Sequence, residues 1–159
     1  MTSLVDLKFK LDEAEHFLSQ MSAKPDRPEI TYNFHAFANA LYSVNVYSKA
    51  VGFGDPVFKQ KRDAIIEPSF KTPSTPAEHA YKLVHDERCN DVHNAPSPAR
   101  KQFKAVLKET VNISGENAAP SVIVIGPNDF EEHYYLGSNP ADELFQTCRL
   151  ALDLAKKLV

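Results

Sequence analysis

The chain has 159 residues, of which 43% are hydrophobic and 25% are charged. A soluble globular protein of this length forms one domain with its own core and needs no metal or disulfide to hold it. The formal net charge of −3 argues against a protein that holds nucleic acid through its overall field. Two groups of basic residues could still form local patches: Lys59, Lys61 and Arg62, or Arg100, Lys101, Lys104 and Lys108.

The cysteine content and the N-terminal segment predict a cytoplasmic protein. Cys89 and Cys148 are too few for the disulfide framework of a secreted domain, so we expect two reduced, largely buried thiols. The segment Met1–Lys8 is charged and amphipathic, unlike a signal peptide. The chain has no run of about 18 apolar residues, so no membrane span is predicted.

Two long amphipathic helices are predicted in the first third of the chain. From Leu4 to Met21, apolar residues recur every three or four positions, and Ser3 is suited to be the N-cap. After a break at Lys24–Pro28, the same spacing runs from Ile30 to Val51. The second helix also carries small residues on another face, so we expect a central helix that is contacted on two sides. These small residues are Ala36, Ala40 and Ser43.

A third and a fourth helix follow, each opened by a capping residue and a proline. Asp55 before Pro56 predicts a third helix that runs to about Glu67, and residues 68–75 are expected to form a loop. Thr75, with Glu78 three residues later, forms a capping-box pattern at the start of the fourth helix. The inner side of that helix is expected to carry Ala77, Ala80, Tyr81, Val84 and Arg88.

The spacing of apolar residues changes in the C-terminal part of the chain. Residues 100–113 mix periods and are expected to be helix passing into strand. The run Ser121–Ile125 predicts a strand, and His133–Leu136 could return beside it after a turn, which gives a small β insertion over about residues 105–137. Asn139–Pro140 would open the last helix, whose apolar stripe is Leu144, Cys148, Ala151, Ala155 and Leu158.

These elements together predict a mainly α fold. Four or five amphipathic helices joined by short breaks favour an up-down helical bundle with a small C-terminal β-hairpin insertion. No internal repeat and no low-complexity tract divides the chain, so residues 1–159 are expected to form one domain.

Several familiar chemical signatures are absent from the sequence. It has no glycine-rich phosphate loop, no Gly-x-Ser-x-Gly elbow and no His-Glu-x-x-His. His85 and Cys89 are four residues apart, with His79 and His93 nearby, but no other helix offers the Glu-x-x-His that metal sites in bundles use. We therefore predict no metal and no cofactor.

The strongest candidate site is the segment Arg88-Cys-Asn-Asp-Val-His93. An arginine binds a phosphate through two parallel hydrogen bonds, and a histidine transfers protons near neutral pH. Metal-free RNA cleavage needs both, because a base must activate the 2′-hydroxyl and a cation must stabilise the phosphate. Five positions along a continuous helix are about 140° apart, so the pair requires either a helix that ends near Asn90 or a second subunit.

Three segments together with the Arg88/His93 spacing resemble the HEPN superfamily, in particular a bacterial branch of it. The resemblance covers roughly Leu4 to Asn94. The family has an arginine followed four to six residues later by a histidine, near the end of a bundle helix. The segments that carry the resemblance are Asp12-Glu-Ala-Glu-His-Phe-Leu18, Phe34-His-Ala-Phe-Ala-Asn-Ala-Leu-Tyr-Ser-Val44 and Asp55-Pro-Val-Phe58.

The resemblance implies a helical bundle that acts as a homodimer. Many members of the family are metal-independent ribonucleases of toxin–antitoxin and phage-defence systems, with the motifs of two subunits facing each other. By this resemblance, Arg88 would bind the phosphate and His93 would be the catalytic base or orienting histidine. Asn90, also a candidate catalytic residue, is displaced by one position from the polar residue of the motif. The family usually has Asn, Asp or His directly after the arginine, whereas this chain has Cys89 there.

That departure leaves a second function open. Some members of the family have lost catalysis and bind nucleotides or partner proteins. The alternative expectation is therefore a catalytically silent bundle that binds RNA, a nucleotide, or a partner such as an antitoxin. A third reading is a structural or regulatory bundle in which the Arg88/His93 spacing arises by chance, because a short motif of this kind is expected about 0.2 times in a chain of this composition.

Overall fold

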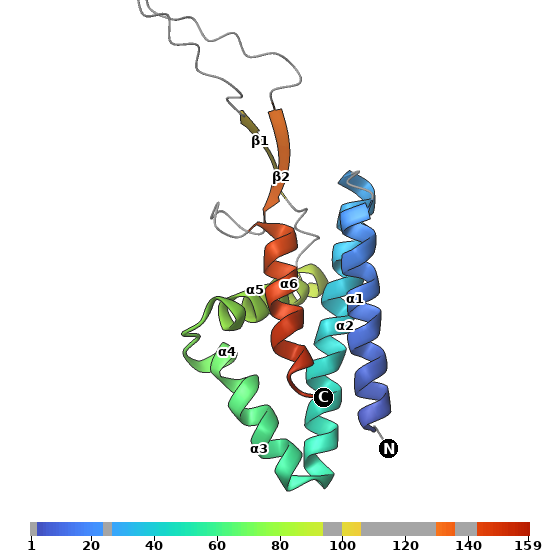
Figure 1. The fold of residues 1–159 in the computed structure, drawn as a ribbon, viewed down its shortest axis with the longest axis vertical. Helices are drawn as coiled ribbons and strands as arrows, with labels where there is room; N and C mark the ends of the chain where they lie inside the picture. The colour runs from blue at the N-terminus through green and yellow to red at the C-terminus, as the bar shows by residue number, and fades with distance from the viewer. Residues whose placement is uncertain (1–2, 24–26, 94–99, 106–129, 136–142) are drawn as a thin grey trace, which may run out of the picture.

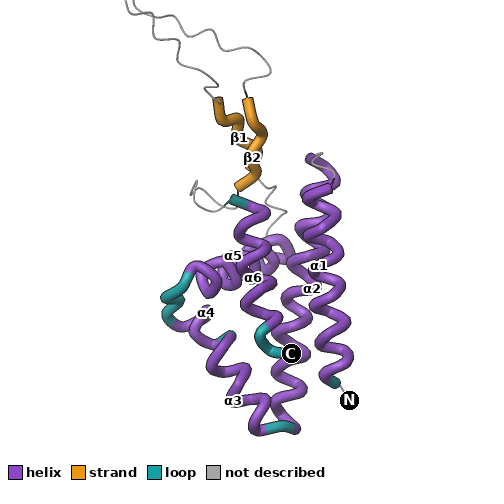
Figure 2. The backbone as a smooth tube through the Cα atoms, viewed as in Figure 1, coloured by secondary structure: helices purple, strands orange, loops and turns teal. Residues whose placement is uncertain are grey.

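The computed structural model describes residues 3–23, 27–93, 100–105, 130–135 and 143–159. Most of these residues are helical, which confirms the prediction of a mainly α chain (Figures 1 and 2). The helices are α1 (Leu4–Ala23), α2 (Arg27–Gly54), α3 (Pro56–Ile65), α4 (Glu67–Lys71), α5 (Pro76–His93) and α6 (Leu144–Lys156). The two strands are β1 (Arg100–Ala105) and β2 (Phe130–Tyr135).

The antiparallel pair α1 and α2 forms the largest part of the core (Figure 1). The Ser3 side chain caps α1 by accepting a hydrogen bond from the backbone N–H of Asp6, and it donates one to the carboxylate of Asp6. Most of both predicted apolar stripes is buried, although Leu4 is 50% exposed and Val51 is only partly buried. Helix α2 also contacts α3 and α5, so its central position is confirmed. The buried stripe residues are Leu7, Leu11, Ala14, Leu18 and Met21 in α1, and Ile30, Phe34, Phe37, Leu41 and Val44 in α2.

The segment between Asp55 and Lys71 contains two helices where one was predicted. Asp55 caps α3 as expected, since its carboxylate accepts hydrogen bonds from the backbone N–H groups of Val57 and Phe58, at 3.0 Å each. Helix α3 ends at Ile65, two residues before the predicted end at about Glu67. The loop predicted for residues 68–75 is wrong in its first part, because α4 begins at Glu67 and ends at Lys71. Pro68 is compatible with helix because it lies in the first turn, where its missing N–H would have no partner.

The helix that carries the candidate site, α5, begins at the predicted capping box. The Thr75 hydroxyl accepts from the N–H of Glu78 at 3.2 Å, and the Glu78 carboxylate accepts from the N–H of Thr75 at 3.1 Å. Ala80, Tyr81 and Val84 are buried as predicted. The helical bundle is confirmed, although α5 runs across the other helices rather than up or down beside them (Figure 1).

The last helix packs against α5 and α1 and completes the core. It begins at Leu144, and its N-cap Glu143 accepts a hydrogen bond from the backbone N–H of Gln146. The predicted opening at Asn139–Pro140 lies outside the described residues. The predicted apolar stripe is buried: Leu144, Cys148, Ala151, Ala155 and Leu158.

The two strands form an antiparallel pair in which Arg100 lies opposite Tyr135 and Ala105 opposite Phe130. The pairing replaces the helix that we expected to begin near Arg100, because β1 takes its hydrogen-bonding partner from a segment 25 or more positions later in the chain. The predicted strand Ser121–Ile125 lies outside the described residues. The predicted returning strand His133–Leu136 overlaps β2.

Candidate functional site

Arg88 lies near the C-terminal end of α5, half-buried against α2. Its Nε donates a hydrogen bond to Oδ1 of Asn39 at 3.2 Å. The guanidinium carbon lies 3.9 Å from the centre of the Tyr42 ring, a cation–π contact that fixes the plane of the group. Asn39 and Tyr42 are three positions apart on α2, so one helix face supplies both contacts.

These contacts involve only Nε and the flat face of the guanidinium. Neither terminal amino group of Arg88 has a hydrogen-bond or ion-pair partner among the described residues. The terminal groups are the ones that grip two oxygens of a phosphate at once. Arg88 is therefore held by its inner nitrogen and its flat face, and its fork of terminal N–H donors is unpaired as far as the described residues are concerned.

The aromatic residues beside Arg88 form a packed cluster around His85. The His85 ring lies 4.8 Å from the Phe70 ring and 5.6 Å from the Tyr42 ring, measured between centroids. Tyr81 packs edge-on against Phe70 at 5.9 Å. This cluster joins α2, α4 and α5, so the helix segment that carries Arg88 rests on a rigid support.

The other two candidate residues follow on the same helix. Asn90 and His93 both lie within α5, which continues as helix to His93. The hypothesis that the helix ends near Asn90 is therefore wrong. Five positions of continuous helix correspond to a rotation of about 140°, so positions 88 and 93 do not share a face of α5 within one chain. The structure brings Arg88 together with Asn39 and Tyr42.

Cys89 and His85 are also neighbours on α5. The Cys89 sulfur lies 3.9 Å from Nδ1 of His85, in keeping with their spacing of four residues. No cluster of three or more His, Cys, Asp or Glu side chains suited to a metal ion occurs among the described residues. The second cysteine, Cys148, is fully buried, and burial raises the pKa of its thiol well above the ordinary value of 9.0, with the Glu143 carboxylate raising it further.

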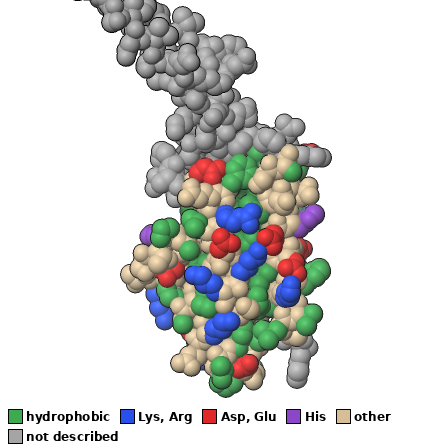
Figure 3. Space-filling model, in the orientation of Figure 1, with side chains coloured by type: hydrophobic (Ala, Val, Ile, Leu, Met, Phe, Trp, Pro, Cys, Tyr) green, Lys and Arg blue, Asp and Glu red, His purple; other side chains and the backbone are tan. Residues whose placement is uncertain are grey.

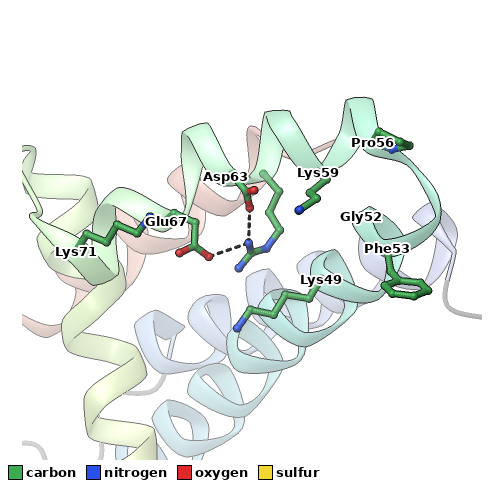
Figure 4. A pocket seen from close by; sticks show the side chains of 9 residues that line it. Lys49, Gly52, Phe53, Pro56, Lys59, Asp63, Glu67 and Lys71 are labelled. Atoms are coloured by element: carbon green, nitrogen blue, oxygen red, sulfur yellow. Dashed lines mark hydrogen bonds and ion pairs between the residues drawn. The ribbon is translucent and has the colours of Figure 1, made fainter.

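One of the two predicted basic patches lacks its arginine at the surface, because Arg62 is buried while Lys59 and Lys61 are exposed. Arg62 is only 4% exposed, because α3 turns it into the interior between α2 and α4. It donates to the side chains of Ser48 and Asn45 on α2, at 3.3 and 3.1 Å. Its Nη1 forms ion pairs of 2.8 Å with both Asp63 and Glu67 (Figure 4). The second predicted patch, which begins at Arg100, has no described side chains.

The electrostatics of the surface agree with the low net charge. On the face shown in Figure 3, Lys and Arg side chains are interspersed with Asp and Glu side chains over the described residues. That arrangement is unlike the single-sign field of a protein that attracts nucleic acid over long distances.

The core contains a large polar side chain, Tyr81, whose hydroxyl is buried. The Tyr81 side chain is 1% exposed, and its hydroxyl has no hydrogen-bond partner in the described part of the chain. Burial raises the pKa of Tyr81 above its ordinary value of 10.0, while the positive charge of Arg62 acts in the opposite direction. Tyr81 thus lies between the Arg62 network and the cluster beside Arg88.

Helices in the described ranges include none that is both long and apolar enough to cross a membrane. Comparison of the chain with known proteins finds no matching family model, no matching curated protein and no matching solved structure.

Proposed function

We propose that this chain is a HEPN-like ribonuclease that cleaves RNA without a metal ion and works as a homodimer, of the toxin or defence type. The observation that carries the proposal is the state of Arg88, whose guanidinium is held by Asn39 and Tyr42 while its terminal N–H groups have no described partner. Such a fixed fork suits a phosphodiester, since less side-chain freedom is lost on binding.

In this mechanism Arg88 binds the scissile phosphate and His93 acts on protons. His93 removes the proton of a ribose 2′-hydroxyl, and the oxygen attacks the neighbouring phosphorus. The bond from phosphorus to the 5′-oxygen breaks, and that oxygen takes up a proton. The products are a 2′,3′-cyclic phosphate and a 5′-hydroxyl. Arg88 stabilises the additional negative charge on the phosphate as the new bond forms.

A composite site of two subunits fits the helix geometry better than a site within one chain. Positions 88 and 93 lie about 140° apart around α5, so one phosphate does not reach both from a single face of the helix. In a symmetric dimer, Arg88 of one copy can face His93 of the other. Homodimerisation is therefore part of the proposal and not an addition to it.

The test is cleavage of a fluorescent RNA oligonucleotide in the presence of EDTA. The wild-type protein is expected to cleave it, and the double variant Arg88→Ala/His93→Ala is expected to lose roughly a hundredfold or more of the rate, since general acid–base catalysis alone contributes about that much. His79→Ala, an exposed histidine earlier on α5, is the matched control and should cleave like wild type. An oligonucleotide with 2′-deoxyribose at every position should remain intact.

Equal cleavage by the wild type and the double variant would refute the ribonuclease, and so would loss of cleavage on adding EDTA. Expression of the wild type in bacteria should also slow growth more than expression of the double variant does. This growth difference tests whether the activity is toxic without an antitoxin or other partner protein.

One observation favours a second candidate, a catalytically silent bundle that binds RNA, a nucleotide or a partner protein. Directly after Arg88 the chain has Cys89, whose thiol lies 3.9 Å from His85 and is a poor replacement for a polar Asn, Asp or His. In that case RNA binding would depend on Arg88 without any cleavage. Fluorescence anisotropy with the same oligonucleotide separates the two, because Arg88→Ala would weaken binding while no product appears.

A further inference from the structure

A second site lies away from Arg88, between α2 and the α3–α4 segment. A cavity of about 740 Å³ opens there (Figure 4). This volume is in the range of small-molecule binding sites. The cavity shares no lining residue with the contacts of Arg88. Near Gly52, α2 and α3 are so close that a Cβ atom would lie 3.2 Å from the Cα of Lys59, which closes one end of the space.

Three lysines from three helices line this cavity. Lys49 comes from α2, Lys59 from α3 and Lys71 from α4, and all three are exposed (Figure 4). None of their ammonium groups forms an ion pair or hydrogen bond with another described residue. Most other lysines in the described ranges do have partners. Those paired with carboxylates are Lys8, Lys10, Lys82 and Lys156, and Lys61 donates to the carbonyl of Leu158.

The wall of the cavity adds a fourth cation and two carboxylates. Arg62 lines it and is neutralised by Asp63 and Glu67, at 2.8 Å each. Four cations against two carboxylates leave an excess of two positive charges in one concave space, on a chain whose net charge is −3. Like charges gathered in a hollow repel one another, and an anion that enters removes this repulsion.

The arrangement suits an anion with more than one charged group. A single carboxylate or sulfate would meet one or two of the three ammonium groups, whereas a chain of phosphates offers oxygens to all of them. The rim also offers an aromatic surface, because Phe53 lines the cavity and is 96% exposed. A flat ring attached to the phosphates could stack there.

We propose that this cavity binds the polyphosphate group of a small molecule, held by Lys49, Lys59 and Lys71. The site is separate from the proposed ribonuclease site and goes beyond that function. The polyphosphate could belong to a nucleotide or to an inorganic chain of phosphates. These two sources share the chemistry that the lysines recognise and differ only in the ring that would meet Phe53.

The test is isothermal titration calorimetry of the full chain with inorganic tripolyphosphate at low ionic strength. The triple variant Lys49→Ala/Lys59→Ala/Lys71→Ala is expected to bind at least about tenfold more weakly, since each lost charged hydrogen bond weakens binding by about that factor. The control is Lys8→Ala/Lys82→Ala/Lys157→Ala, which removes the same charge elsewhere and should bind like wild type. Five of the six lysines are exposed, and the Lys82 side chain is 42% exposed. Circular dichroism verifies that both variants fold.

Two results would overturn the proposal: no binding of tripolyphosphate by the wild type, or an equal loss in both triple variants. Titration with ATP distinguishes the two sources. Tighter binding of ATP that Phe53→Ala abolishes identifies a nucleotide, and equal binding of ATP and tripolyphosphate identifies an inorganic chain. Arg88→Ala should bind both probes normally, so failure at the proposed ribonuclease site would not affect this result.

Discussion

Replacing Arg62 by methionine is expected to destabilise the protein by about 3 kcal/mol. Methionine fills similar space but removes all four hydrogen bonds of the guanidinium. The largest loss is at Asn45, which is 4% exposed and whose Oδ1 would remain without its donor, at a cost of about 1–3 kcal/mol.

The other three partners lose less. The Ser48 hydroxyl still donates to the carbonyl of Asn45 at 2.9 Å. Side chains of Asp63 and Glu67 are 42% and 30% exposed, so water replaces the lost ion pairs and each contributes at most about 1 kcal/mol. A domain with a typical stability of about 5–15 kcal/mol therefore remains folded and measurable.

Urea unfolding followed by circular dichroism measures the effect. Lys61→Met is the matched control, since it changes the adjacent exposed lysine, whose one bond is to the carbonyl of Leu158, and should cost no more than about 1 kcal/mol. The double variant Arg62→Met/Asn45→Ala should lose less stability than the two single changes added together, because they share one interaction. Additive losses, or a change below about 1 kcal/mol in Arg62→Met, would show that the network does not support the core.

Three further changes test other parts of the core and the caps. Tyr81→Phe should leave the free energy of unfolding unchanged or raise it by about 1 kcal/mol in thermal unfolding, because it removes a buried hydroxyl that has no described partner. A loss of more than about 1 kcal/mol would show that the hydroxyl has a partner. A thiol reagent such as DTNB should modify half-buried Cys89 in the folded protein and Cys148 only in urea. Burial raises the pKa of the Cys148 thiol and blocks access to it. Immediate reaction of both thiols in the folded protein would contradict this prediction. Hydrogen bonds from Ser74 lower the pKa of Glu78 below its ordinary value of 4.5. The ionised cap therefore stabilises the fold above pH 4.5, and this contribution is lost as the pH falls through the pKa of Glu78 in the folded protein. In Glu78→Gln, the free energy of unfolding should depend less on pH below about 4.5.

The helices were predictable because their signals are local. Spacing of apolar residues and capping patterns such as Thr75 with Glu78 depend on a few neighbouring positions. The break between α3 and α4 and the pairing of β1 with β2 were missed. Pro68 was interpreted as a loop residue although it is compatible with a first helical turn, and β1 depends on a partner far along the chain.

The site residues also differ in whether a local sequence signal predicts their contacts. Arg88 was identified from a sequence motif. Its hydrogen bond to Asn39 and its cation–π contact with Tyr42 depend on how α5 crosses α2, which the motif does not specify. The burial of Arg62 did have a local signal, because Phe58, Arg62 and Ile66 are spaced by four and share one helix face. The cavity of Lys49, Lys59 and Lys71 had none, since it arises only when α2 and α3 fold back on each other.

The length of α5 makes a prediction that separates a two-subunit site from a site within one chain. If Arg88 of one copy works with His93 of the other, mixing the inactive variants Arg88→Ala and His93→Ala should restore activity. Each mixed dimer then contains one intact site and one that lacks both residues, so random mixing gives about one quarter of wild-type cleavage. The mixture is unfolded and refolded together so that subunits exchange, and each variant treated alone is the control. A site within one chain is damaged in every subunit, so a mixture that stays as inactive as its components would refute the composite site even if the wild type cleaves RNA.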